Sequence, residues 1–152
     1  MSESSVQRIH GSYLMPHFDH ATVADAMHPG ILSCEPDATL TEVARMMSTH
    51  HVHCIVVTAA AEGASGETPV WGIISDIDLL RAGIRPGAVG TAAELAQRPF
   101  VMVDTTTVLR DAAELMLKNG ISHVVAVNPA TKRPTGILST LDIAGVLAWG
   151  EM

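Results

Sequence analysis

The sequence is poor in aromatic and basic residues, and each shortage excludes a class of protein. Aromatic side chains make up 3% of the 152 residues while 47% are apolar, so any core has to be built from aliphatic packing. The 9 Lys and Arg are outnumbered by 16 Asp and Glu, which gives a net charge of −7. Proteins that bind nucleic acids or anionic membrane surfaces usually do so through basic patches. We therefore expect no nucleic-acid partner and no membrane partner.

Cysteine and long apolar runs are scarce as well. Cys34 and Cys54 lie in apolar surroundings without a C-x-x-C pattern, which is typical of small buried residues in a reducing compartment. No stretch approaches the roughly 18 apolar residues that a membrane-spanning helix needs. The N-terminal residues lack the apolar segment of a signal peptide. These absences predict a cytoplasmic protein without disulfide bonds.

What the chain does contain is an internal repeat. A shift of 69 residues aligns Leu40–Met47 with Leu109–Met116, with three of eight positions identical. A shift of 64 residues aligns Gly72–Asp78 with Gly136–Asp142, with four of seven identical. The two shifts differ because of the stretch Ala59–Pro69, whose Ala, Gly, Glu, Ser and Thr residues are typical of a surface loop. A duplication followed by one loop insertion explains both shifts.

Each copy has the same expected order of elements, β-α-β-β-α, preceded by a short helix. Apolar residues spaced i, i+3, i+4, i+7 mark one amphipathic helix per copy, and Thr39 with Glu42 predicts a capping box at the first. The expected elements are Val23–Met27, Ile31–Cys34, a helix from Leu40, Cys54–Thr58, Val70–Ile74 and a helix from Asp76, then Ala92–Ala96, Phe100–Val103, a helix from Leu109, Val124–Val127, Gly136–Leu138 and a helix from Thr140.

These elements predict an α/β (α+β) fold of two tandem repeats, residues 21–86 and 87–152. Because neither half has a comfortable core alone, we expect their sheets to pack face to face with pseudo-two-fold symmetry. Residues 1–20 lie outside both copies and predict a flexible or partner-dependent N-terminal arm.

The most specific pattern is Gly, two apolar residues, Ser, two further residues and Asp at the last strand-to-helix junction. It occurs as Gly72…Ser75…Asp78 and again, in register, as Gly136…Ser139…Asp142. With the duplicated β-α-β-β-α order, this pattern resembles the CBS (cystathionine beta-synthase) domain family over roughly residues 22–149. The resemblance implies a regulatory pair of domains, a Bateman module, that binds an adenine nucleotide and carries no chemistry of its own.

The resemblance also assigns roles to the repeated pattern. Asp78 and Asp142 would accept hydrogen bonds from the ribose hydroxyls, and Ser75 and Ser139 would face the phosphate. A Ser at a helix N-terminus suits an anion because unpaired N–H groups and the helix dipole meet there. The alternative is that Ser-x-x-Asp is only a capping box, and the sequence leaves both interpretations open.

Further candidate residues surround this pattern. Gly72 and Gly136 would let the backbone pass close to a ligand. The resemblance implies that adenine is read by the main chain of the first strand, namely by Ile31 to Ser33 and by Phe100, Val101 and Met102. His53 and His123 enter the second strand of their copies, where an imidazole could stack on adenine or meet a phosphate; the alternative is a partly buried histidine at a strand edge. Arg81 could reach a phosphate, but a solvated surface charge is the plainer interpretation.

A metal site is one competing hypothesis. His50, His51, His53 and Cys54 crowd together, and His28 or His123 could join them. Imidazole and thiolate suit zinc, but this spacing matches no closed structural-zinc pattern. Metal binding therefore stays a weaker alternative, and we expect no metal ligand and no cofactor.

An enzyme is a second competing hypothesis. His53 and Cys54 superficially pair a base with a nucleophile, but adjacent residues of a strand point to opposite faces. The sequence also contains no phosphate-binding loop, nucleophile elbow or zinc-protease motif. We expect no catalytic residue.

A dimerisation module with empty pockets is the remaining alternative, since it would have the same fold. We expect a homodimer in either case, associating through helix faces into a disc, because the final helix of each copy carries surplus apolar residues: Ile77, Leu79 and Leu80, and Leu141, Ile143, Val146 and Leu147. We expect no catalytic, channel or DNA-binding segment to accompany the repeats. Regulation would then act in trans, as an energy or metabolite sensor for an unidentified protein, or through the N-terminal arm.

Overall fold

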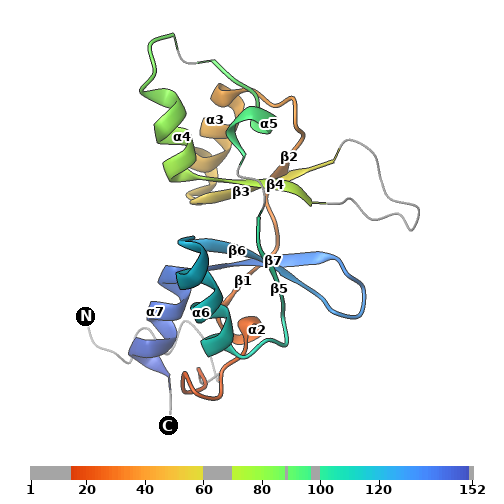
Figure 1. Cartoon of the computed structure of the whole chain (residues 1–152), viewed down its shortest axis with the longest axis vertical. Coiled ribbons are helices and arrows are strands. Elements are labelled where there is room, and N and C mark those ends of the chain that lie inside the picture. Colours follow the sequence, from red (N-terminus) through yellow and green to blue (C-terminus); the bar gives the residue numbers. More distant parts are fainter. Residues whose placement is uncertain (1–14, 60–69, 88, 97–99, 151–152) are drawn as a thin grey trace.

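The protein consists of two similar halves, each a small sheet covered by helices on its outer side (Figure 1). The structure, a computed structural model, describes residues 15–59, 70–87, 89–96 and 100–150. The elements in chain order are α2 (Val23–Ala26), β1 (His28–Pro29), β2 (Ser33–Cys34), α3 (Leu40–His50), β3 (Cys54–Thr58), β4 (Val70–Ser75), α4 (Asp76–Gly83), α5 (Ala92–Leu95), β5 (Met102–Asp104), α6 (Leu109–Asn119), β6 (His123–Val127), β7 (Pro134–Ser139) and α7 (Thr140–Trp149). The predicted β-α-β-β-α order is confirmed in both copies.

The two sheets share one pairing scheme. In the first half β2 runs parallel to β3, which is antiparallel to β4, and Cys54 lies opposite Ser75. In the second half β5 runs parallel to β6, which is antiparallel to β7, and His123 lies opposite Ser139. In both halves, therefore, the first residue of the middle strand faces the serine that begins the last helix.

The β-branched middle strands are buried on both faces. Ile55 and Val57 belong to the core under α3, whereas Val56 packs with Val125 and Val127 of the second half. Alternate residues of a strand point to opposite faces, so one face meets helices and the other meets the partner sheet. The predicted face-to-face packing of the sheets is thus confirmed.

Local signals in the sequence set the helix ends. Thr39 Oγ1 accepts a hydrogen bond from the Glu42 N–H at 3.1 Å, and Glu42 Oε2 accepts one from the Thr39 N–H at 3.0 Å. The capping box is therefore confirmed. At the far end of α6, Gly120 takes a left-handed conformation with φ 61°, which stops the helix just before β6. No helix in the described part of the chain is long and apolar enough to span a membrane.

The two halves exchange short segments. β1 belongs to the first copy in sequence, yet it pairs with β7, with His28 opposite Ile137. The preceding α2 places Val23 in the core of the second half, and α5 places Ala92 in the core of the first. Isolated bridges join Thr22 to Val108 and Thr39 to Thr91, which exchange places under the 69-residue shift. The exchange is therefore reciprocal and follows the pseudo-two-fold symmetry.

The last residues of the predicted N-terminal arm pack against the rest of the protein instead of forming a free arm. Residues 1–14 lie outside the described residues, so that part of the arm stays a prediction. Met15 and Phe18, however, pack against the core of the second half, Arg110 lies over the Phe18 ring at 4.8 Å, and its guanidinium pairs with Asp19. Two apolar residues among polar ones give no periodic signal, which is why the sequence did not reveal this packing.

Candidate functional site

The N-termini of α4 and α7 are built alike. Asp78 Oδ2 accepts hydrogen bonds from the Ser75 N–H at 2.8 Å and from Ser75 Oγ at 2.9 Å, and the Asp78 N–H donates back to Ser75 Oγ at 3.3 Å. In the second copy Asp142 Oδ2 accepts from the Ser139 N–H at 2.8 Å, and the Asp142 N–H donates to Ser139 Oγ at 3.1 Å. The Ser-x-x-Asp pattern therefore caps its helix in both copies, as the simpler interpretation predicted.

Capping uses one oxygen of each carboxylate, and the other oxygen faces a basic group. Asp78 Oδ1 lies 3.6 Å from a guanidinium nitrogen of Arg81, one turn along the same helix. Asp142 Oδ1 lies 2.8 Å from Nδ1 of His28, which comes from β1. Both aspartate side chains are only 6% exposed, so both carboxylates are held in place within largely desolvated surroundings.

A cavity of about 370 Å³ lies where the two halves meet. Its polar groups come from both halves, with Ser75, Asp78 and Arg81 on one side and Ser122 and His123 on the other. Its remaining walls are mostly apolar: Ile73, Ile77, Met116, Leu117, Gly120 and Ile121. A mostly apolar cavity of roughly 300–1,000 Å³ with a few convergent polar groups is typical of a small-molecule site. A second cavity, of about 280 Å³, borders Asp78 and Arg81 as well and continues to Arg85 and Glu94.

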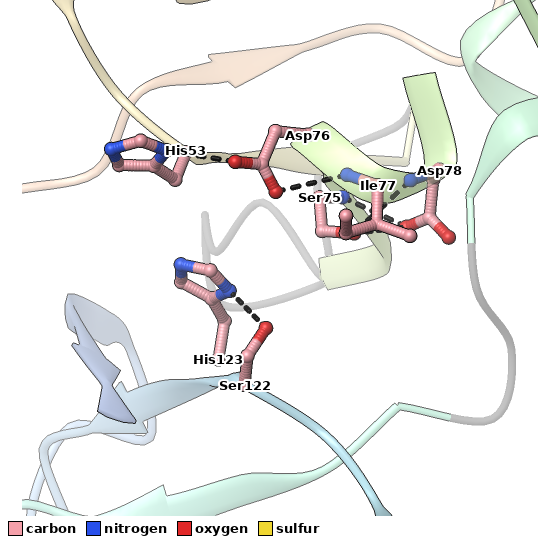
Figure 2. A network of polar contacts seen from close by, with 7 residues as sticks. All are labelled: His53, Ser75, Asp76, Ile77, Asp78, Ser122 and His123. Carbon is pink, nitrogen blue, oxygen red and sulfur yellow. Dashed lines mark hydrogen bonds and ion pairs between the residues drawn. The ribbon is translucent and has the colours of Figure 1, made fainter. Parts of the chain in front are cut away.

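Two histidines stand at the junction beside this cavity (Figure 2). His53 Nδ1 lies 2.8 Å from Asp76 Oδ2, and the Ile77 N–H donates to Asp76 Oδ1 at 2.9 Å. Partial burial opposes ionisation of Asp76, yet the hydrogen bonds from His53 and Ile77 hold the pKa of this carboxyl below its usual value. Asp76 is therefore an anion at neutral pH, fixed at the first turn of α4.

The second histidine, His123, comes from the other half. Its Nδ1 lies 2.9 Å from Ser122 Oγ. Burial lowers the pKa of His123; the negative charge of Asp76 opposes this effect, while a positive charge on His53 adds to it. The imidazole is thus neutral at neutral pH in the absence of a ligand.

The structure brings together only part of the predicted site. Ser75, Asp78 and His123 border one cavity, although they come from both copies. His53 points outward, is 68% exposed and pairs with Asp76. Ser139 and Asp142 form their own cluster with His28 at the other helix N-terminus.

The first-strand residues are engaged in the sheets. Ile31 packs into the apolar cluster between the two sheets. Ser33 is exposed and lies opposite Val56. The carbonyl of Val101 accepts a hydrogen bond from the Val125 N–H at 3.3 Å. Reading of adenine by this part of the main chain stays a prediction.

The two motif glycines lie within the sheets. Gly72 is buried opposite Val57. A Cβ on Gly136 would lie 2.4 Å from the carbonyl oxygen of His28, so this position is glycine because β1 passes against it. The close approach that Gly136 permits is therefore that of the chain's own backbone.

Sequence reasoning missed the contact of His28 with Asp142 and the contribution of the α6 terminus, where Leu117 and Gly120 line the cavity. β1 is two residues long and pairs with a strand at the far end of the chain. A segment that short has no periodicity to detect. The only indication in the sequence is that His28 directly precedes Pro29 and Gly30, and this does not reveal which strand the segment pairs with.

The described residues offer no group of three or more His, Cys, Asp or Glu side chains that could hold a metal ion. Cys54 is buried between the sheets, and burial raises the pKa of its thiol to about 12. His53, its neighbour in sequence, is exposed and pairs with Asp76. Cys54 is therefore a packed thiol, which is neither a thiolate ligand nor a nucleophile at neutral pH.

Comparison with known proteins gives matches along most of the chain. The family model of the CBS domain matches twice, at residues 23–85 and 92–148. An uncharacterized 17.7 kDa protein of Acidianus ambivalens is 26% identical over 113 residues, which cover 74% of this chain and 65% of that protein. The match thus spans slightly less than two thirds of that relative's length.

Solved structures share the fold. The CBS domain pair of protein MJ0100, in complex with 5′-methylthioadenosine and S-adenosyl-L-methionine, superposes with a TM-score of 0.71 at 20% identity, over 84% of this chain and 96% of that one. The CBS domain of a bacterial CNNM/CorC family Mg²⁺ transporter in complex with ATP has a TM-score of 0.70 at 15% identity, over 88% and 92% of the two chains.

Proposed function

The chain belongs to the CBS domain family, with two CBS domains in tandem, and from this premise we propose that it is a regulatory module that binds an adenosine-containing nucleotide. The observation that carries the proposal is the cavity of about 370 Å³ between the two halves, with the buried Asp78 carboxylate at its edge. The ligands of the two structural relatives, which all contain adenosine, agree with this choice.

The lining of the cavity suits the three parts of a nucleotide. Ile73, Ile77 and Ile121 give the cavity apolar walls against which a purine ring can be buried. The Asp78 carboxylate, fixed by its capping bonds, can accept hydrogen bonds from a cis-diol. Arg81 and His123 supply cationic or hydrogen-bond-donating groups for a phosphate. One small molecule would thus contact both halves at once.

Regulation rather than catalysis follows from this arrangement. A ligand that touches α4 of one half and β6 of the other stabilises one relative placement of the halves over others. The affected surface would then be read by a target protein. We propose no catalytic residue in this arrangement.

We propose that a second copy of the chain covers the apolar surface of α4 and α7. Ile77 and Leu80 on α4 are 51% and 61% exposed, and Leu141 and Leu147 on α7 are 74% and 65% exposed. Figure 1 shows these two helices on the same side of the molecule. Fewer apolar residues of these helices are exposed than the sequence predicted, because Ile143 and Val146 are buried in the core of the second half.

A melting-temperature screen tests the function. The ligands are AMP, ADP, ATP, NAD and S-adenosylmethionine, each nucleotide being compared with its guanosine counterpart where one exists. A ligand that binds only the folded state at a hundredfold excess over Kd adds about 2.7 kcal/mol of stability, which is a shift of several degrees for a domain of this size. A flat response from folded, nucleotide-free protein would contradict the proposal and favour a dimerisation module with empty pockets.

A further inference from the structure

The lining of the cavity between the halves includes two basic side chains, one from each half. Arg81 comes from α4 of the first half, and His123 comes from the start of β6 in the second. Ser75, which the family resemblance assigns to the phosphate, already donates its N–H and its hydroxyl to Asp78 and accepts the Asp78 N–H. A phosphate entering this cavity therefore has to find its donors elsewhere, and it has to overcome repulsion from Asp78.

His123 is held in a position to be such a donor. Ser122 Oγ lies 2.9 Å from Nδ1, which fixes the ring. Figure 2 shows the other ring nitrogen turned away from Ser122. A serine hydroxyl can either donate to a bare nitrogen or accept from an N–H, so Ser122 satisfies Nδ1 in both protonation states of the ring. The opposite nitrogen, Nε2, is an N–H donor in the charged ring and in the neutral tautomer whose Nδ1 accepts a hydrogen bond from the Ser122 hydroxyl.

We propose that His123 is the group by which this cavity distinguishes a phosphorylated adenosine from the bare nucleoside, and that its imidazole takes up a proton when the phosphate binds. The inference rests on the proposed function and adds to it the ligand class, a nucleoside phosphate, and a dependence on pH.

The charges around the ring explain the proton uptake. Asp76 and Asp78 of α4, Asp142 of α7 and His53 all act on His123, and Arg81 shares the cavity with it. Burial outweighs the carboxylates and keeps the pKa of His123 below its usual value in the free protein. A bound phosphate brings up to two further negative charges against the ring, which raises this pKa. Affinity for the phosphate therefore increases as the pH falls from above the bound-state pKa to the free-state pKa.

Calorimetric titration with AMP tests the proposal. Titrations at neutral pH in two buffers of different ionisation enthalpy give the number of protons taken up per AMP bound. The variants are His123→Gln, which keeps a hydrogen-bond donor but cannot titrate, and His50→Gln, a matched control at the exposed end of α3. Adenosine serves as the ligand without a phosphate.

We expect the wild type and the His50→Gln protein to take up more protons per AMP than the His123→Gln protein does. We also expect His123→Gln to weaken AMP binding about tenfold to a hundredfold, the range for hydrogen bonds that involve a charged group, because the glutamine amide offers the phosphate a neutral donor in place of a protonated imidazole. Adenosine should bind all three proteins equally. Equal proton uptake in the wild type and His123→Gln, or equal losses of AMP and adenosine affinity, would overturn the inference.

Two further readouts keep the result interpretable. Circular dichroism and the melting temperature show whether His123→Gln folds; if it does not, imidazole NMR of the wild type measures the pKa of His123 directly with and without AMP. An unchanged pKa would overturn the inference. Binding of AMP without proton uptake contradicts only the role of His123, whereas absence of binding by both AMP and adenosine contradicts the proposed function as well.

Discussion

The imidazole of His28 lies 2.8 Å from Oδ1 of Asp142, so the first copy of the repeat supplies the basic partner for the acidic motif residue of the second. The corresponding aspartate, Asp78, faces Arg81 of its own helix instead. Two motifs that look interchangeable in the sequence thus have different surroundings. The two copies are therefore not expected to be equivalent in function.

Loss of the Asp78 charge should weaken nucleotide binding. Asp78→Asn keeps an oxygen that can accept the capping bonds from Ser75 but removes the charge that would bind the ribose hydroxyls. We expect AMP affinity to fall by about 1.5–3 kcal/mol, the range for hydrogen bonds to a charged group. Calorimetry measures the change, with Asp111→Asn on the exposed face of α6 as the control. Unchanged affinity in Asp78→Asn would show that this carboxylate does not hold the ribose.

A methyl group at Gly136 should destabilise the fold. Its Cβ would lie 2.4 Å from the carbonyl oxygen of His28 and 3.0 Å from the sulfur of Met27, so β1 would have to move away from β7. We expect Gly136→Ala to lose about 1–3 kcal/mol of unfolding free energy, as overpacked sites do. Gly145→Ala is the matched control, because no atom lies within 4 Å of its added Cβ and it sits inside α7.

The control should behave in the opposite way. Alanine in a helix interior is favoured over glycine by about 0.5–1 kcal/mol, so Gly145→Ala should be slightly more stable than the wild type. Urea unfolding of the three proteins measures both effects. If both variants lost the same stability, the contact between β1 and Gly136 would not be the cause.

Stability should fall in mildly acidic solution because of His123. Its pKa in the folded protein is below that of the unfolded chain, so the unfolded chain binds more protons between these two values. The free energy of unfolding is therefore highest above the unfolded pKa of about 6.5 and decreases as the pH falls from there toward the folded pKa. His123→Gln should show a smaller decrease than the wild type when urea unfolding is repeated across this range. A parallel decrease in both proteins would assign the effect to other groups.

Charged residues on the exposed apolar faces should separate the dimer. Leu80→Glu together with Leu147→Glu places two carboxylates on the surface of α4 and α7 that we propose is covered by a second copy. We expect light scattering to give the dimer mass for the wild type and the monomer mass for the variant. Circular dichroism should be unchanged, since both side chains are mostly exposed in the monomer. A wild type that stays monomeric at high micromolar concentration would contradict the dimer.

Periodic and repeated features were predictable from the sequence. The stripe containing Val43 and Met47 and the β-branched run Ile55–Val57 have regular spacing, and regular spacing follows from burial on a defined face. The duplicated Gly-Ser-Asp pattern predicted the two helix N-termini in register. These features depend only on neighbours along the chain, which a sequence displays directly.

The composition of the site was less predictable, because it depends on contacts between distant segments. His123 was a candidate for the pocket of its own copy, yet it lines a cavity with Ser75 and Asp78 of the other. The role of Gly136 could be read as space for a ligand or for the backbone, and only the position of β1 decides between them. Arg81 looked like an ordinary surface residue in the sequence, and only the packing of the two halves shows that it also borders the cavity.

The reciprocal exchange of α2, β1 and α5 has a consequence for synthesis of the protein. Val23 is buried against residues of the second half, and β1 pairs with β7, so the beginning of the chain has no folding partner until the last strand has left the ribosome. The first half likewise lacks Ala92 until the linker after α4 has been translated. The core of the first half is therefore complete once α5 has been translated, whereas the second half cannot finish folding before β7 has been made, and Val23 stays without its packing partners until then.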